Sequence, residues 1–296
     1  MSSDRGDIRT AERLNGLQVM RALGCLGIAF AHSAAFAEMA FPGMREGFTL
    51  NFWGRYGLLS LVTFFFAISG FLVAREVDTS EQGALTFLKK RAVRIYPTYW
   101  VGVVLAVFLF VITGVRTNFG HLLRGMLLLP IRDASFVLNG EWTLLHDIMF
   151  YLLSAPFFLL KKSRMSAYRC FLGVWLVVIL GATHFLSIGY LPQMTFPNIL
   201  FSRFNISLIA GALSYDLYRV SKKNQNISRL MKYAGLLSVG LYFINYEWFY
   251  QKSIIGEIIH YVLLLPIILG FLSMEVSGRN WLVAVGNCSY GIYLSH

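Results

Sequence analysis

The chain has 296 residues, of which 56% are hydrophobic, 16% aromatic and only 14% charged, and its mean hydropathy is +0.60. Soluble domains carry about 25% charged residues, so this composition excludes an ordinary soluble protein and predicts an integral membrane protein. The net charge of +11 comes from Lys and Arg residues dispersed between apolar runs, which argues against a nucleic-acid-binding protein.

The N-terminal segment joins a long polar head to an apolar run that ends in AAFA. Such an ending is similar to a signal-peptide cleavage site, but the length of the head and Arg21 within the run argue against cleavage. We therefore expect residues 1–16 to form a cytoplasmic tail and residues 17–296 to form one transmembrane domain.

Apolar runs of about the length needed to span a membrane recur along the chain. They predict a polytopic all-α transmembrane bundle of about nine helices. The segment 121–130, HLLRGMLLLP, is too short to span, and we place it in an outer loop or a re-entrant turn. The expected helices lie near 17–36, 57–74, 96–113, 143–160, 168–188, 204–218, 233–250, 254–273 and from 282 to the end.

The distribution of positive charge predicts the orientation. With a cytoplasmic N-terminus, 18 of the 26 Lys and Arg residues fall in inner segments, seven in outer segments and Arg21 within the first helix. Cytoplasmic loops of membrane proteins carry the excess of Lys and Arg, so the N-terminus is expected to be cytoplasmic. The last apolar run stops at YLSH, where the final backbone carbonyls would stay unpaired in lipid, so we expect the chain to be C-terminally incomplete.

Two ionisable residues, Arg21 and His32, lie within the first expected helix. Eleven residues apart, they share one face with an offset of about 20° and are about 16 Å apart along the axis. Because a charge inside a membrane is costly, both residues are candidates for function. An Arg near the cytoplasmic end could hold an anion while a deeper His handles a proton or an acyl group. A snorkelling Arg and a core His are the structural alternative.

The stretch FLKKRAVRIYPTYW, residues 87–100, places a basic run before an apolar helix expected to begin at Pro97. If this stretch is helical, Arg91 and Arg94 share a face. Such a pair suits a phosphate, which guanidinium groups bind through two parallel hydrogen bonds. Ordinary anchoring of an inner loop, or attraction to anionic lipid, is the alternative.

Two further stretches place polar residues within expected helices. Ser69 and Gly70, in FFFAISGF, would let a neighbouring backbone approach closely, and a ligand could use the same space. In NGEWTLLHDIMFY, Asp147 lies just over one turn inside the outer end of the fourth helix, whereas His146 points to a different face. A buried carboxylate there could orient a histidine or accept a hydroxyl proton.

The final stretch, GNCSYGIYLSH, carries a polar stripe that is unusual for lipid contact and includes Tyr293 and His296. Measured along its helix, His296 reaches about the depth of His32. The three cysteines lie inside apolar segments, and their spacing predicts neither a metal site nor a disulfide framework.

In their order and wording, these five stretches resemble the acyltransferase 3 family of integral membrane acyltransferases. The family includes O-acetylases of O-antigen, exopolysaccharide, Nod factor and peptidoglycan, and usually has about ten helices. The resemblance covers nearly the whole chain, and LNGLQVMRA is similar to the opening of the exopolysaccharide acetyltransferase branch. Its most specific pieces are Arg21 followed after ten residues by His32, the SGF of the second helix, Arg91-x-x-Arg94 and SYGIYLSH.

The resemblance implies an O-acyltransferase of the bacterial inner membrane. It would move an acyl group, acetyl in the common case, from cytoplasmic acetyl-CoA or another acyl-CoA to a hydroxyl of an exported or surface saccharide. Arg91 and Arg94 would meet the phosphates of CoA, and Arg21 would steady the donor. His32 would act as general base or transient acyl carrier, which suits a neutral imidazole.

The remaining site assignments follow the same resemblance. Asp147 stands where the family usually has Glu, and we expect it to be catalytic. Ser69 and Gly70 are assigned to the donor, and Trp142, Tyr293 and His296 to the acceptor.

The expected partners are membrane lipid and a saccharide or lipid-linked glycan, without nucleic acid or metal. A transporter or flippase of a glycolipid is the alternative, since such proteins also carry polar residues inside their spans. An inactive truncated paralogue is another.

Overall fold

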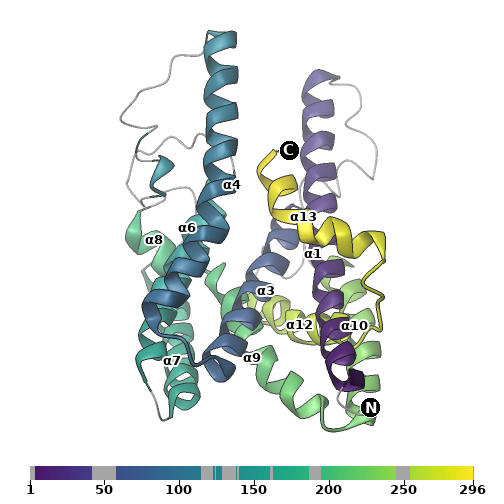
Figure 1. Ribbon diagram of the computed structural model, residues 1–296. Helices are drawn as coiled ribbons and strands as arrows, with labels where there is room; N and C mark the ends of the chain where they lie inside the picture. Colours follow the sequence, from purple (N-terminus) through teal and green to yellow (C-terminus); the bar gives the residue numbers. More distant parts are fainter. Residues whose placement is uncertain are drawn as a thin grey trace. The chain divides into compact units, whose positions relative to one another are not determined.

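The computed structural model describes residues 4–41, 58–114, 123, 125–128, 138, 140–160, 163–186, 195–244 and 254–295. Across these ranges the regular structure is helical and no strand occurs (Figure 1). The helices are α1 (Asp4–Ala40), α3 (Leu58–Thr79), α4 (Ala84–Thr113), α6 (Glu141–Ser154), the 3₁₀ helix η3 (Ala155–Leu159), α7 (Arg164–Phe185), α8 (Phe196–Leu200), α9 (Asn205–Ser221), α10 (Gln225–Ile244), α12 (Ile254–Leu272) and α13 (Trp281–Ser295).

The expected all-α fold is confirmed, because each of the nine segments expected from the apolar runs overlaps a described helix; residues 57, 187–188, 245–250 and 296 of these segments lie outside the described residues. By length and composition, five helical stretches of the described chain can cross a membrane, and a further apolar helix, Ile258–Leu272, is shorter. The protein is therefore a multi-pass membrane protein. The five stretches are Asn15–Ala34, Ala84–Thr113, Glu141–Leu159, Arg164–Phe185 and Phe196–Ser221.

The expectation that a helix begins at Pro97 is wrong. The helix α4 begins at Ala84 and continues through Pro97, which lies inside it. Residues 84–96 include Leu, Lys and Arg, which favour helices in their own right. Proline removes one backbone hydrogen bond, a loss that membrane helices tolerate where neighbouring groups compensate. Arg91 and Arg94 are consequently helical, as their pairing on one face requires.

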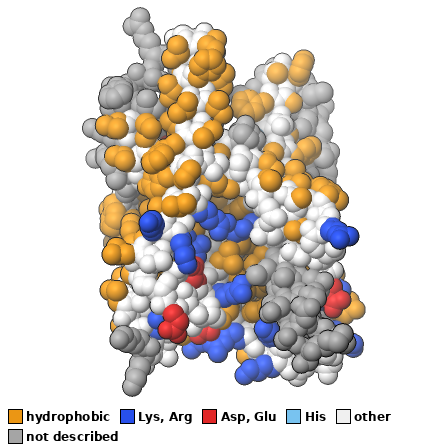
Figure 2. All heavy atoms as spheres, viewed as in Figure 1, with side chains coloured by type: hydrophobic (Ala, Val, Ile, Leu, Met, Phe, Trp, Pro, Cys, Tyr) orange, Lys and Arg blue, Asp and Glu red, His pale blue; other side chains and the backbone are white. Residues whose placement is uncertain are grey.

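The two halves of α4 differ in character. Its first half carries the basic run, whereas large hydrophobic side chains of its second half are exposed, among them Val104, Phe108 and Leu109. Figure 2 shows this apolar surface along the upper part of α4. Exposed apolar side chains at helical spacing fit contact with lipid.

The helix α1 also extends beyond its apolar run. It begins at Asp4 and therefore includes most of the polar head, while the stretch apolar enough to span is Asn15–Ala34. The division of the chain at residue 16 stays a prediction.

The segment 121–130 is described at Leu123 and at residues 125–128. Tyr96, Tyr99 and Trp100 of α4 donate hydrogen bonds of 2.7–3.3 Å to the backbone carbonyls of residues 125–127. These three donors lie near the middle of α4, about 18 Å or more from its first residue. The described residues of this segment thus pack against the middle of α4, and its placement in an outer loop or a re-entrant turn stays a prediction.

The chain divides into two compact units. Unit 1 comprises residues 1–72, 210–294 and 296, and unit 2 comprises residues 73–209 and 295. The chain passes from unit 1 to unit 2 within α3 and returns within α9. Each unit is described by itself below.

Unit 1 packs its helices closely at glycines. A Cβ atom at Gly211 of α9 would collide with the backbone of Ala67 in α3, and one at Gly286 of α13 would collide with the backbone of Gln18 in α1. Gly235 of α10 likewise meets the backbone of α12. Small residues permit such approaches, and dispersion contacts between close helices drive association in lipid.

A buried polar and aromatic group joins α3, α10 and α12 of unit 1. The hydroxyl groups of Thr63 and Tyr242 share a hydrogen bond, and the ring of His260 stacks on Tyr242 with centroids 4.1 Å apart. All three side chains are buried. A hydrogen bond between helices satisfies groups that lipid cannot.

Unit 2 has stacked aromatic rings in its core, and an arginine side chain bonds the end of α3 to the start of α7. The rings of Phe87 in α4 and Phe158 in η3 stack with centroids 4.4 Å apart. Arg164, the first residue of α7, donates through Nη1 to the carbonyl oxygens of Val77 at 3.2 Å and Ser80 at 2.5 Å. The carbonyl groups at the end of α3, which lack helical partners, are satisfied in this way.

Candidate functional site

A polar cluster in unit 2 joins the end of α3 to the first turns of α4. Arg91 donates through Nη2 to Oε2 of Glu76 in an ion pair. The guanidinium carbon of Arg91 also lies 5.1 Å from the ring centroids of both Phe87 and Tyr151. The Arg91 side chain is only 12% exposed, so one carboxylate and two aromatic rings fix its position.

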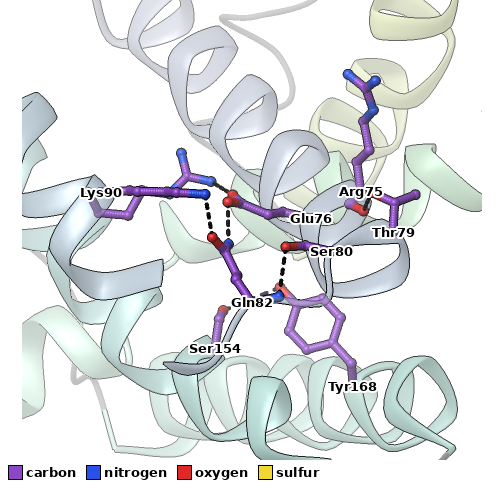
Figure 3. A network of polar contacts seen from close by, with 9 residues as sticks. Arg75, Glu76, Thr79, Ser80, Gln82, Lys90, Ser154 and Tyr168 are labelled. Carbon is purple, nitrogen blue, oxygen red and sulfur yellow. Dashed lines mark hydrogen bonds and ion pairs between the residues drawn. The ribbon is translucent and has the colours of Figure 1, made fainter. Parts of the chain in front are cut away.

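The cluster also includes Gln82, which lies in the turn between the two helices and bonds to both Glu76 and Lys90. Its Nε2 donates to Oε1 of Glu76 at 2.5 Å, and Lys90 Nζ donates to its Oε1 at 2.6 Å. Figure 3 shows Gln82 between Glu76 and Lys90, with Arg75 extending away from them. We call Glu76, Gln82, Lys90 and Arg91 the hairpin cluster.

Two more cations flank the hairpin cluster. Lys89 and Arg94 are exposed on α4 and make no hydrogen bond or ion pair with the rest of the described chain. Because α4 is helical here, Arg94 lies on the same side as Arg91, three residues along. The four cations outnumber the three carboxylates of this helix end and turn, Glu76, Asp78 and Glu81, so this end of α4 attracts anions such as phosphate.

Arg21 and His32 are both half-buried on α1 of unit 1. Gly24 and Gly27 pack against Phe65 and Leu61, so this side of α1 faces α3. On the helical wheel, Arg21 and His32 lie about 90–110° from that side, toward the side of α1 on which α13 packs. Nη1 of Arg21 also donates to Oε1 of Gln18 at 3.4 Å.

The other residues predicted in unit 1 lie on α3 and α13. The ring of Tyr293 lies 6.0 Å from that of Phe65, which in turn lies against Gly24. The structure thus brings Tyr293 close to the helix that carries Arg21 and His32. Ser69 is half-buried and Gly70 buried. His296 lies outside the described residues.

The helix α6 of unit 2 carries Trp142 and Asp147, both half-buried. The ring of Trp142 lies 5.2 Å from Phe204 and 5.8 Å from the ring of His146. The buried His146 has its Nδ1 2.8 Å from the carbonyl oxygen of Trp142. Since a carbonyl only accepts, Nδ1 carries a proton and donates to this oxygen.

Sequence reasoning missed three of these residues. His146 was set aside because it points away from Asp147, although its spacing of four from Trp142 indicates a shared face. Glu76 and Gln82 lie in a stretch that the positive-charge distribution assigns only to an inner segment. An acidic residue and a basic run on either side of a short turn between two helices are the signal that could have found them.

The predicted residues therefore form two groups. In unit 1 the structure brings Arg21, His32 and Tyr293 to neighbouring helices, and in unit 2 it places Arg91 and Arg94 on one helix. Across the described parts of the chain, no group of three or more His, Cys, Asp or Glu side chains could hold a metal ion.

The sequence was compared with models of known protein families. A family model described as an acyltransferase domain matches residues 14–296. No curated protein and no solved structure matches the chain. The match takes in all of unit 2, unit 1 from residue 14 onward, and every predicted site residue. With nearly all of its length matched, the chain belongs to the acyltransferase 3 family and is a membrane acyltransferase.

Proposed function

We propose that the protein is an O-acyltransferase of the bacterial inner membrane. It transfers an acyl group, acetyl in the simplest case, from cytoplasmic acyl-CoA to a hydroxyl group of an exported or surface saccharide. The observation that carries this proposal is the family match over residues 14–296. The charges of the hairpin cluster and its neighbours support the donor.

Coenzyme A carries a diphosphate and a further phosphate, and these groups need cations at the membrane surface. Lys89, Lys90, Arg91 and Arg94 supply them on the first turns of α4. Guanidinium groups bind phosphate with paired hydrogen bonds, and ammonium groups bind it as point charges. We assign the donor phosphates to this end of unit 2.

The acyl transfer itself is assigned to His32. As a neutral imidazole it takes the proton of the acceptor hydroxyl while the hydroxyl oxygen attacks the thioester carbonyl and the thiolate of CoA leaves. Alternatively, its nitrogen attacks first and carries the acyl group to the acceptor. Arg21 steadies the donor, and Ser69 and Gly70 line its path. As the sequence indicated, we assign a catalytic role to Asp147. The acceptor is assigned to Trp142, Tyr293 and His296.

Replacing His32 tests this function in cells. In a strain that lacks the chromosomal copy, the His32→Ala variant should lower saccharide acylation by about 100-fold or more, the scale of a lost general base. Mass spectrometry of the purified saccharide measures the acyl content. The control is His184→Ala, because His184 is an exposed histidine on α7, and this variant should acylate normally at equal protein level.

Two results would count against the proposal. Full acylation with His32→Ala would remove His32 from the mechanism. A saccharide that the unaltered protein relocates without adding an acyl group would replace acyl transfer by transport.

A further inference from the structure

We propose that Glu76 is a positioning residue for the donor: an acidic side chain that prepares the anion site by holding Arg91 directly and Lys90 through Gln82. The inference rests on the proposed function, which supplies the anion in the form of acyl-CoA. Its consequence is that removing a negative charge weakens, rather than strengthens, the binding of a negatively charged ligand.

Both oxygens of the Glu76 carboxylate are engaged. Oε2 accepts from Arg91 and Oε1 accepts from Gln82 at 2.5 Å. Glu76 lies on the last turn of α3 and its partners lie on the following turn and helix. The 23% exposed carboxylate is therefore held between two fixed donors and cannot turn away without breaking a bond.

Arg91 keeps donors for a second anion while it is bound to Glu76. A guanidinium has five N–H donors in a fixed plane. Nη2 serves Glu76, and Nε is buried without an acceptor, whereas Nη1 makes no bond within the described chain and is the donor left for an anion. Phe87 and Tyr151 hold the plane of the group. A phosphate that approaches the exposed edge therefore meets a donor whose orientation is already set.

Lys90 would diverge from Arg91 without Gln82. Successive helical residues point about 100° apart, and such neighbours do not face each other. Gln82 accepts from Nζ of Lys90 at 2.6 Å and donates to the carboxylate that also holds Arg91. The bridge thus brings two cationic groups to one place, where they can share a diphosphate.

Two effects of Glu76 on an anion oppose each other. Its negative charge repels the phosphates, and its bonds prepare the cations that attract them. Simple charge counting favours tighter binding when the carboxylate is neutralised, whereas the geometry of the hairpin cluster favours weaker binding. The sign of the change in affinity therefore decides between them.

Binding of coenzyme A to the purified full chain in lipid nanodiscs measures this sign by isothermal titration calorimetry. We expect Glu76→Gln to raise the Kd for CoA by about 10-fold. Gln82→Ala should raise it by about 3-fold, because only the link between Lys90 and Glu76 is lost. Glu81→Gln is the matched control: it changes the charge equally in the same turn, at an exposed side chain without a bond to the described chain. Its Kd should stay equal to that of the unaltered protein or fall.

A role in folding alone would give a different result. The number of CoA sites per chain should stay unchanged in Glu76→Gln while the Kd rises, whereas partial unfolding lowers the number of sites. In an acylation assay, the KM for acyl-CoA should rise with kcat unchanged. If Glu76→Gln does not fold, Gln82→Ala carries the same test without breaking the ion pair.

The possible failures are distinct. If the unaltered protein binds no CoA, the donor assignment in the proposed function is wrong. If it binds CoA and Glu76→Gln binds it as tightly or more tightly, the positioning role is overturned while the proposed function stands.

Discussion

At the scale of single residues, Arg91 combines a structural and a binding role through the shape of its head group. Its planar guanidinium lies against the rings of both Phe87 and Tyr151 and bonds to Glu76 at the same time. A lysine has the same charge but a compact, strongly hydrated ammonium that neither stacks nor forms a fork. Charge alone therefore does not describe what this position requires.

Arg91→Lys should consequently impair donor binding even though it conserves charge. We expect a rise in the Kd for CoA of about 10-fold, because the bond from Nη2 to Glu76 and the contacts with two rings are lost together. Arg94→Lys is the matched control, since Arg94 is exposed and should act as a point charge with a change of about 3-fold or less. Calorimetry on both variants decides, and a larger effect at Arg94 would contradict the role assigned to Arg91.

At the scale of the helices, unit 1 depends on backbones that approach more closely than any side chain would allow. Gly211 of α9 lies against the backbone of Ala67 on α3, and Phe71, one turn further along α3, contacts the ring of Tyr215 with centroids 5.7 Å apart. A glycine and a large aromatic contact thus alternate along the same helix pair. Since lipid is as apolar as the helix surfaces, this fit supplies much of the association energy.

Gly211→Ala should therefore destabilise the protein. The added methyl group meets backbone rather than a movable side chain, so α9 has to shift, at a cost of about 1–3 kcal/mol. Gly240→Ala on α10 is the control: nothing lies within 4 Å of its added methyl, and better helix propensity should leave stability equal or about 0.5–1 kcal/mol higher. Thermal unfolding in detergent compares the two, and equal midpoints would show that the α3–α9 contact is not tight.

The sequence predicted the apolar part of each membrane helix better than the residue at which the helix begins. Apolar runs located the membrane helices because lipid contact needs an unbroken apolar surface. They missed the start of α4, since its first turns are basic and exposed and Pro97 resembles a beginning. The cations of the site were predictable from the charge run. The bonds of Glu76 were not, because they depend on how α3 and α4 meet across a turn, which no periodicity encodes.

At the scale of the whole molecule, side-chain bonds within each unit join helix ends that lie near Lys or Arg residues in the sequence. In unit 2, the bonds from Arg164 to the carbonyls of Val77 and Ser80 bring the start of α7 to the turn that precedes the basic run of α4. In unit 1, Nδ2 of Asn15 donates to the carbonyl of Val276 at 3.1 Å and joins the start of the first span to the turn before α13. The basic residues on the first turns of α4 and α7 are thus brought to one end of unit 2, as the positive-inside rule favours.

These basic ends should face the cytoplasm, and cysteine labelling can test that orientation. In a variant without its three native cysteines, single cysteines replace Glu81 after α3, Lys223 after α9 and Leu186 after α7. A membrane-impermeant maleimide should label only Leu186→Cys in intact cells, and all three after permeabilisation, because successive spans reverse the side of each turn. The outcome bears directly on the donor: acyl-CoA is cytoplasmic, so the hairpin cluster can meet it only if Glu81, one residue before Gln82, faces the same compartment. Labelling of Glu81→Cys from outside would place the cations of α4 where no acyl-CoA exists, and both the orientation and the donor site would have to be abandoned.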